Sequence, residues 1–174
     1  YSDNGDTITI TGYHGTGGDI IIPDTIDGKP VTEIGSYAFS QKVKIRSTLT
    51  LPTGLTEIGS EAFSRCRGFT GTLTLPSTLE SIGGSAFYDC SGFSGSLVIP
   101  EGVSKVESMA FYDCSGFTGT LTLPSTLTTI GSQAFLGCSG FSGSLVIPEG
   151  VTTIEYSAFS GCSGFTGTLT LPST

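Results

Sequence analysis

The sequence predicts one domain, a mainly β, right-handed solenoid in which strands of successive 24-residue coils stack into parallel ladders. Three observations lead to this prediction. Glycine supplies 26 of the 174 residues, charged residues make up only 13%, and residues of several types recur at a fixed spacing. The recurrence is plainest in a phrase, GFTGTLTL or GFSGSLVI, that occurs five times, at residues 68–75, 92–99, 116–123, 140–147 and 164–171. This composition indicates a chain that bends at fixed intervals rather than long amphipathic helices.

The period is read from three residue types that recur every 24 positions: Pro52, Pro76, Pro100, Pro124, Pro148 and Pro172; Phe63, Phe87, Phe111, Phe135 and Phe159; Cys66, Cys90, Cys114, Cys138 and Cys162. One unit cannot bury its own apolar side chains, whereas stacked units can. We therefore expect a core of phenylalanine on phenylalanine and cysteine on cysteine, with strands about 4.8 Å apart.

The first element of a unit, as in residues 120–143, is a short strand, TLTLP. Leucine and threonine alternate in it, which places Leu121 and Leu123 on one face and Thr120 and Thr122 on the other.

Proline then ends the strand, because it has no N–H for a further ladder bond. After Pro124, LTTI (127–130) is interpreted as a second apolar edge and SQAF (132–135) as one turn of α- or 3₁₀-helix. GCSGFSG (137–143) is the return bend, where glycine adopts backbone angles that a Cβ would penalise.

Residues 1–18, a strand and a turn, are predicted to be an N-terminal β cap, and residues 19–174 the solenoid. A degenerate unit opens the solenoid, with five extra residues between Pro23 and Ile34. Five full units follow, and the last strand is expected to leave an open apolar coil. Units alternate between TLTLPST and SLVIPEG, so the larger repeat is a pair of 48 residues.

LTLPSTLTTIGSQAFLGC (121–138) and LVIPEGVTTIEYSAFSGC (145–162) resemble the BspA-like, Treponema-type bacterial leucine-rich repeats, whose units read LxIPxxVxxIGxxAFxxC. The resemblance covers residues 19–174. It implies a leucine-rich-repeat solenoid that is cell-surface or secreted and adheres to host proteins or other cells.

The net charge of −8 and pI of about 4.3 argue against a nucleic-acid partner, because phosphate binding needs a cluster of Lys and Arg. Six of the seven basic residues lie in the first 67 residues: Lys29, Lys42, Lys44, Arg46, Arg65 and Arg67. The sequence contains no run of 18 apolar residues, so membrane insertion is not predicted. The polar start YSDNGD shows no signal peptide.

No catalytic, metal or cofactor site is predicted. The five cysteines include no CxxC pair and have no histidine partner, and the parallel Cβ vectors of stacked rungs suit disulfides poorly, so we interpret them as buried free thiols. His14 is the only histidine, which excludes a Ser-His pair elsewhere. GTGGD (15–19) is interpreted as a turn, and DNGD (3–6) is too short for a calcium loop.

The positions that differ between units are candidates for a binding surface. We name as the tyrosine ridge the residues that follow the repeated Phe, with Arg65 expected beside Asp89: Arg65, Tyr88, Asp89, Tyr112, Asp113 and Leu136. Exposed aromatic residues in a row are plausible contacts, although the same residues could simply shield the edge of the core.

A second candidate is a hydroxyl face, formed by Thr72, Thr74, Ser96, Thr120, Thr122, Ser144, Thr168 and Thr170. The alternative for this face is strand propensity alone.

The leading hypothesis is a non-enzymatic module that binds a protein, such as a host matrix or cell-surface protein. The alternative is a structural spacer or fibre subunit that stacks end to end through its C-terminal coil.

Overall fold

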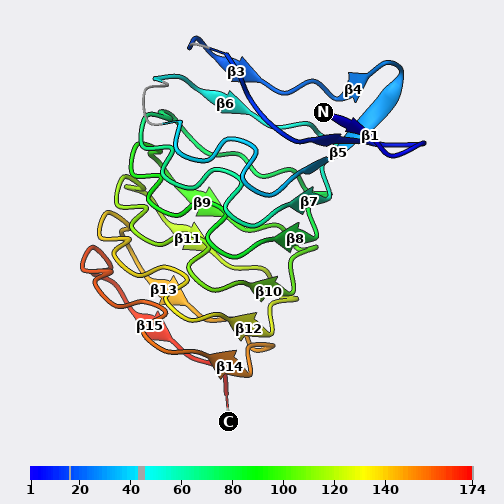
Figure 1. Cartoon of the computed structure of the whole chain (residues 1–174). Coiled ribbons are helices and arrows are strands. Elements are labelled where there is room, and N and C mark those ends of the chain that lie inside the picture. The colour runs from blue at the N-terminus through cyan, green and yellow to red at the C-terminus, as the bar shows by residue number, and fades with distance from the viewer. Residues whose placement is uncertain (16, 43–45, 174) are drawn as a thin grey trace.

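The computed structural model describes the whole chain except residues 16, 43–45 and 174. The chain winds into a β-solenoid of about seven turns, with the N-terminus at one end and the C-terminus at the other (Figure 1). This confirms the predicted fold class, and the short strands recur at the predicted spacing of about 24 residues.

Two rows of short strands run along the solenoid. The first row contains β3 (Ile20–Ile21), β6 (Leu49–Thr50), β9 (Leu97–Val98), β11 (Leu121–Thr122), β13 (Leu145–Val146) and β15 (Leu169–Thr170). The second contains β2 (Ile8–Ile10), β5 (Lys29–Ile34), β7 (Glu57–Ile58), β8 (Ser81–Ile82), β10 (Lys105–Val106), β12 (Thr129–Ile130) and β14 (Thr153–Ile154). Neighbours that pair within a row are parallel, as Lys105 with Thr129. The predicted alternation also holds, because Leu121 and Leu123 are buried while Thr120 and Thr122 are exposed.

The 24-residue register extends into the N-terminal segment. β1 (Ser2–Asp3) pairs antiparallel with β2, and β2 pairs parallel with β5, where Thr9 faces Glu33 and Ile10 faces Ile34. The ring of Tyr13 then stacks on Phe39 at 5.4 Å between centroids. Residues 8–13 therefore occupy the place of a preceding coil.

The five extra residues of the degenerate unit form a β-hairpin. β4 (Thr25–Ile26) pairs antiparallel with the start of β5, and the turn residues Asp27 and Gly28 have φ of 52° and 77°. An Asp-Gly pair with both φ positive is typical of a two-residue hairpin turn that suits the twist of its strands. The insertion is thus accommodated outside the stacked coils.

The helical turn predicted at SQAF is wrong, and no helix occurs among the described residues. The segment is a series of tight turns in which Gln133 is left-handed, with φ of 56°. This geometry turns alternate N–H groups toward the next coil, so Gln133 donates to the carbonyl of Tyr156 at 2.9 Å and Phe135 to that of Ala158 at 2.8 Å. A helix would direct these donors along its own axis instead.

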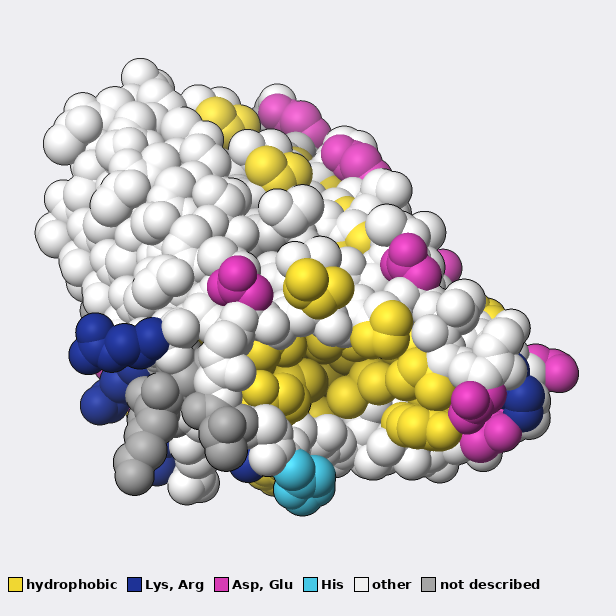
Figure 2. All heavy atoms as spheres, turned by 90° about the horizontal axis from the view of Figure 1, so that it is seen from above, with side chains coloured by type: hydrophobic (Ala, Val, Ile, Leu, Met, Phe, Trp, Pro, Cys, Tyr) yellow, Lys and Arg dark blue, Asp and Glu magenta, His cyan; other side chains and the backbone are white. Residues whose placement is uncertain are grey.

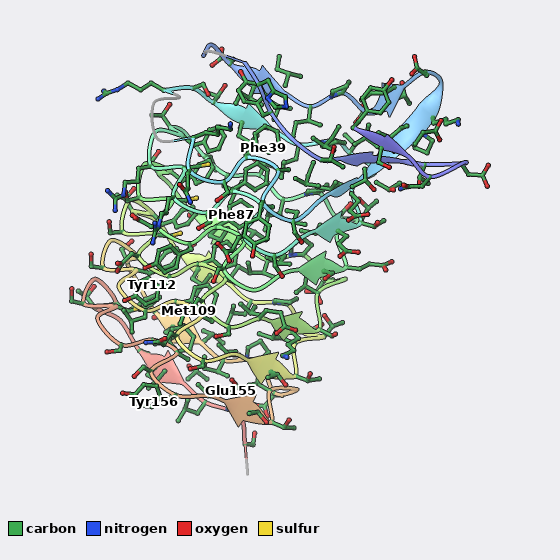
Figure 3. All side chains as sticks on the ribbon, viewed as in Figure 1. Phe39, Phe87, Met109, Tyr112, Glu155 and Tyr156 are labelled. Carbon is green, nitrogen blue, oxygen red and sulfur yellow. The ribbon has the colours of Figure 1, made fainter. Side chains whose placement is uncertain are left out.

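The core consists of stacked rings and thiols. One column of rings from Phe39 to Phe159 has centroids 5.0–5.4 Å apart, and a second runs from Phe69 to Phe165 (Figure 3). Each thiol donates to the carbonyl oxygen of a Phe 27 residues earlier, as Cys90 to Phe63 at 3.0 Å. Each coil thereby ties its polar core atom to its predecessor.

The alternation of unit types has a structural counterpart. Strands of the first row pair only where the proline of the earlier coil is followed by an acid, which gives β3 with β6, β9 with β11, and β13 with β15. In the central pair, Leu97 donates to the carbonyl of Thr120 at 2.9 Å, and Glu101 accepts from the backbone N–H and hydroxyl of Ser125 at 2.9 and 2.8 Å. Asp24 and Glu149 make equivalent contacts. The 48-residue repeat is therefore a hydrogen-bonded pair of coils.

Candidate protein-binding surface

The side chains after the core phenylalanines form one column on the turn side of the solenoid, with Tyr112 labelled in Figure 3. Phe87 and Phe111 are fully buried, and the next residue in each coil, Tyr88 or Tyr112, is half-buried at the surface. The two tyrosine rings stack with centroids 4.8 Å apart and an interplanar angle of 15°. Leu136, also half-buried, occupies the same position in the next coil.

Left-handed residues on both sides set the direction of these tyrosines. Ser85 and Asp89 flank Tyr88 with φ of 56° and 55°, and Met109 and Asp113 flank Tyr112 in the same way. Between these left-handed residues the chain buries the Phe and leaves the following Tyr at the surface. The ridge is therefore produced by the turns that replace the expected helix.

The carboxylate of Asp89 pairs with a residue that the sequence did not single out for the ridge. Asp89 is paired with Arg67, whose Nε lies 2.7 Å from the carboxylate. Arg65 stands 24 residues before Asp89, at the equivalent left-handed position of the preceding coil. Its side chain lies over the ring of Tyr88, with its Cζ 5.8 Å from the centroid.

Asp89 itself is buried, so it supports the ridge and is not an exposed contact. Its pairing keeps the pKa of the Arg67 guanidinium raised through a hydrogen bond. Asp113 is exposed, and its charge raises the pKa of the adjacent Tyr112 phenol. The outward-facing ridge thus presents two aromatic rings between a cation and an anion.

The sequence did not predict a hollow that lies beside the ridge. It has a volume of about 460 Å³ and is lined by Gln41, Glu61, Ser64, Arg65, Ser85 and Tyr88. Ser64 stands in the column of Tyr88 and Tyr112, so the hollow occupies the space that a third ring would fill. The only signal in the sequence is this replacement of an aromatic residue by serine.

The hydroxyl face is only partly polar. Ile21, Val98 and Val146 lie in its column of outward-facing strand positions and are exposed. The hydroxyls of Ser96 and Ser144 accept hydrogen bonds from backbone N–H groups of the next coil at 3.0 Å, so their acceptor capacity is used within the fold. Two shallow grooves open on this face, of about 490 and 380 Å³.

The described residues contain no group of three His, Cys, Asp or Glu side chains placed to hold a metal ion. The five thiols are free, and four of them are buried. Burial raises the pKa of Cys66 to about 11, and it also raises that of Cys90 and Cys114, so these thiols are not activated nucleophiles. Within the same residues, no helix has the length and hydrophobicity to cross a membrane.

The repeated coils and their buried ladders match a family model, the BspA type leucine rich repeat region, in six copies over residues 32–166. The chain belongs to the BspA-type leucine-rich repeat family. The repeat fold of this family is typically non-catalytic, and its domains generally mediate protein interactions. Comparison with proteins of curated function gave no significant match.

Solved structures of bacterial leucine-rich repeat proteins are similar to this BspA-type chain. A leucine-rich repeat protein of T. pallidum is 31% identical with a TM-score of 0.85, over 98% of this chain and 78% of that one. A leucine-rich cell surface protein of Faecalibacterium prausnitzii is 29% identical with a TM-score of 0.67, over 95% of this chain and 51% of that one. A Bacteroides ovatus protein, 23% identical with a TM-score of 0.75, shares the fold over 99% of this chain and 51% of its own. The chain thus spans about half the length of the last two.

Proposed function

We propose that the chain is a non-enzymatic, protein-binding module of a bacterial cell-surface or secreted protein, and that its partner contacts the tyrosine ridge. The observation that carries the proposal is the stack of Tyr88 on Tyr112, two half-buried rings held face to face at 4.8 Å. Tyrosine and arginine are enriched among the residues that dominate binding energy at interfaces. BspA-type proteins are typically surface or secreted, which supports a partner outside the cell.

The stack is suited to binding because its geometry is fixed before a partner arrives. Arg65 over Tyr88 and the pairing of Arg67 with Asp89 hold the ridge on the N-terminal side. A rigid aromatic contact costs little side-chain entropy when it is covered, so more of its burial appears as affinity.

The test compares the two tyrosines of the ridge with a tyrosine outside it. The double variant Tyr88→Ser and Tyr112→Ser is measured against a panel of immobilised extracellular-matrix proteins and host cell-surface proteins by surface plasmon resonance. We expect a loss of about 10-fold or more, the size of an interface hot spot. Tyr156→Ser is the matched control, because Tyr156 is 78% exposed but outside the ridge.

Failure of the wild-type protein to bind any member of the panel would contradict the adhesion proposal. Equal affinity of the double variant and the wild-type protein for a bound partner would exclude the ridge as the contact. Circular dichroism establishes that the variants keep their fold.

A second candidate function is end-to-end self-association, the role of a spacer or fibre subunit. It is favoured by four apolar side chains exposed at the C-terminal coil: Ile154, Tyr156, Leu169 and Leu171. These belong to β14, β15 and the residues beside them, where the outer strand edges have no neighbour among the described residues. Sheet edges with apolar side chains tend to pair with another chain.

Sedimentation velocity over a wide range of concentrations tests this candidate. We expect association in the wild-type protein and its loss in Leu169→Lys. Val98→Lys is the control, because Val98 is an exposed apolar residue of the same row of strands in the middle of the solenoid. A monomer at all concentrations would exclude the spacer role for this chain.

A further inference from the structure

The hollow beside the tyrosine ridge has the polar lining of a binding site, and its composition limits the ligand. Arg65 and Glu61 both line it, so an anion would be repelled by the carboxylate and a cation by the guanidinium. The Glu61 carboxylate also accepts a hydrogen bond from Tyr37, which raises the pKa of that phenol. The remaining polar groups, Gln41, Ser64 and Ser85, can donate and accept.

This combination matches a ligand with many neutral hydroxyl groups. A hydroxyl is both a donor and an acceptor, so it can be satisfied by the guanidinium on one side and by the carboxylate on the other. Tyr88 supplies the one aromatic wall, next to the apolar C–H groups that a sugar ring would present. The volume of about 460 Å³ falls within the range of small-molecule sites.

The hollow lies in line with the column of tyrosine rings. In the next two coils the equivalent positions hold Tyr88 and Tyr112, whose rings stack at 4.8 Å. At Ser64 the ring is missing, and the serine is buried. The Arg65 guanidinium lies over the Tyr88 ring, so a ligand above Ser64 would contact both Arg65 and Tyr88.

The left-handed positions bear on the test of this site. One column of them runs through the solenoid, and its residues are Gln41, Arg65, Asp89, Asp113, Gly137 and Gly161. Glycine adopts this conformation without penalty and aspartate is tolerated, but longer L residues there cost about 1 kcal/mol or more. The two long side chains of the column, Gln41 and Arg65, both line the hollow. Long left-handed residues such as Tyr37, Met109 and Gln133 also stand away from the hollow, so the conformation belongs to the repeated turns.

We propose that the hollow between Ser64 and Tyr88 binds a neutral oligosaccharide, with one or two sugar rings beside Tyr88 and hydrogen-bonded by Arg65, Glu61 and Gln41. The site shares Arg65 and Tyr88 with the tyrosine ridge, whereas Tyr112 does not line it, so Tyr112 distinguishes this proposal from the protein-binding one.

The experiment applies the whole chain to an array of neutral and sialylated oligosaccharides, and then titrates it with the best neutral one by calorimetry. Ser64→Tyr fills the hollow with the side chain that the next two coils carry, and we expect at least about 10-fold weaker binding. Ser160→Tyr makes the same change in the same column outside the hollow, and it is expected to leave binding unchanged.

Arg65→Gly is the second variant. Gly137 and Gly161 occupy the same column, so this change relieves the left-handed strain and is not expected to lower stability. A loss of sugar binding with an unchanged or higher midpoint of urea unfolding would support the proposal.

Three results would overturn it: no binding of any neutral oligosaccharide, equal effects of Ser64→Tyr and Ser160→Tyr, or a clear preference for sialylated ligands. Tyr112→Ser separates the two proposals, because it should weaken protein binding and leave sugar binding intact.

Discussion

Truncation of one ring in the middle of the phenylalanine ladder, Phe111→Ala, gives the most direct test of the packing. Phe111 is fully buried and stacks on Phe87 at 5.3 Å and on Phe135 at 5.4 Å. Removing a buried phenylalanine costs about 3–5 kcal/mol, and two stacked contacts worth about 0.5–1.5 kcal/mol each belong to that loss. We therefore expect a decrease of about 4–5 kcal/mol in the free energy of unfolding, measured by urea denaturation with circular dichroism.

Phe159→Ala is the matched control, since it makes the same change in the same column. Phe159 is only half-buried and has one stacked neighbour in the column, Phe135, at 5.3 Å. Its truncation should cost about 1–2 kcal/mol, because less area is lost and the site opens to solvent instead of leaving a cavity. Equal losses for the two variants would refute the view that stability comes from stacking between coils.

Three further predictions follow from contacts between coils. Gly116→Ala should lower the free energy of unfolding in urea severely, because the new Cβ would lie 2.2 Å from a backbone oxygen of the preceding coil. Gly54→Ala, with open space around it, should be neutral or stabilising by up to about 1 kcal/mol. Similar effects of the two variants would refute close approach as the reason for the repeated glycine. Asp19 accepts two hydrogen bonds from Thr48 that lower its pKa below 3.8. Its contribution to stability is therefore present above pH 3.8 and is lost as the pH falls through the lowered pKa. Asp19→Asn should flatten the acid side of the curve of stability against pH, and an unchanged curve would count against the contact. With iodoacetamide at neutral pH, the half-buried Cys162 should be labelled first and the buried thiols only on unfolding, so uniform labelling of the native protein would contradict the buried thiol ladder.

The ladders could be predicted from sequence because they depend only on period and alternation. Leu121 and Leu123 must share a face of any extended strand, and residues 24 apart must share a column of any solenoid with that repeat. The predicted helical turn failed for a local reason. Non-glycine residues such as Gln133 adopt φ of 56° there, and no propensity of glutamine indicates this conformation. The cost of this backbone conformation is offset by the hydrogen bond from Gln133 to the carbonyl of Tyr156 in the next coil. A single repeat unit does not contain that bond.

The candidate surface divides in the same way. Stacking of Tyr88 on Tyr112 follows from spacing alone, and the structure shows that stack. The pairing of Arg67 with Asp89 does not follow from spacing, because the two residues are 22 apart and occupy different positions of the repeat. The hollow is a missing side chain in a column, so it becomes visible only when the neighbouring rings are in place.

Unequal junctions between coils give a last prediction about how the array can change length. A unit with an acid after its proline hydrogen-bonds to the next coil through its strand and through Glu101 or its equivalent, while the other described junctions of the first row lack strand pairing. Deleting 97–144 removes one complete pair and restores the order of unit types, whereas deleting 97–120 removes the unit that carries Glu101 and places two TLTLPST units in contact. Two units without an acid after the proline, TLTLPTG (48–54) and TLTLPST (72–78), are adjacent at β6 and the following coil, and there the structure has a groove instead of strand pairing. If all junctions were equal, the short deletion would cost half as much unfolding free energy as the long one, because stability in stacked repeats is a sum of units and neighbour contacts. We expect the short deletion to cost well over half of the unfolding free energy that the long one costs, since it removes one strong junction and spares only a weak one. A cost of half or less would mean that the paired junctions are no more stable than the others.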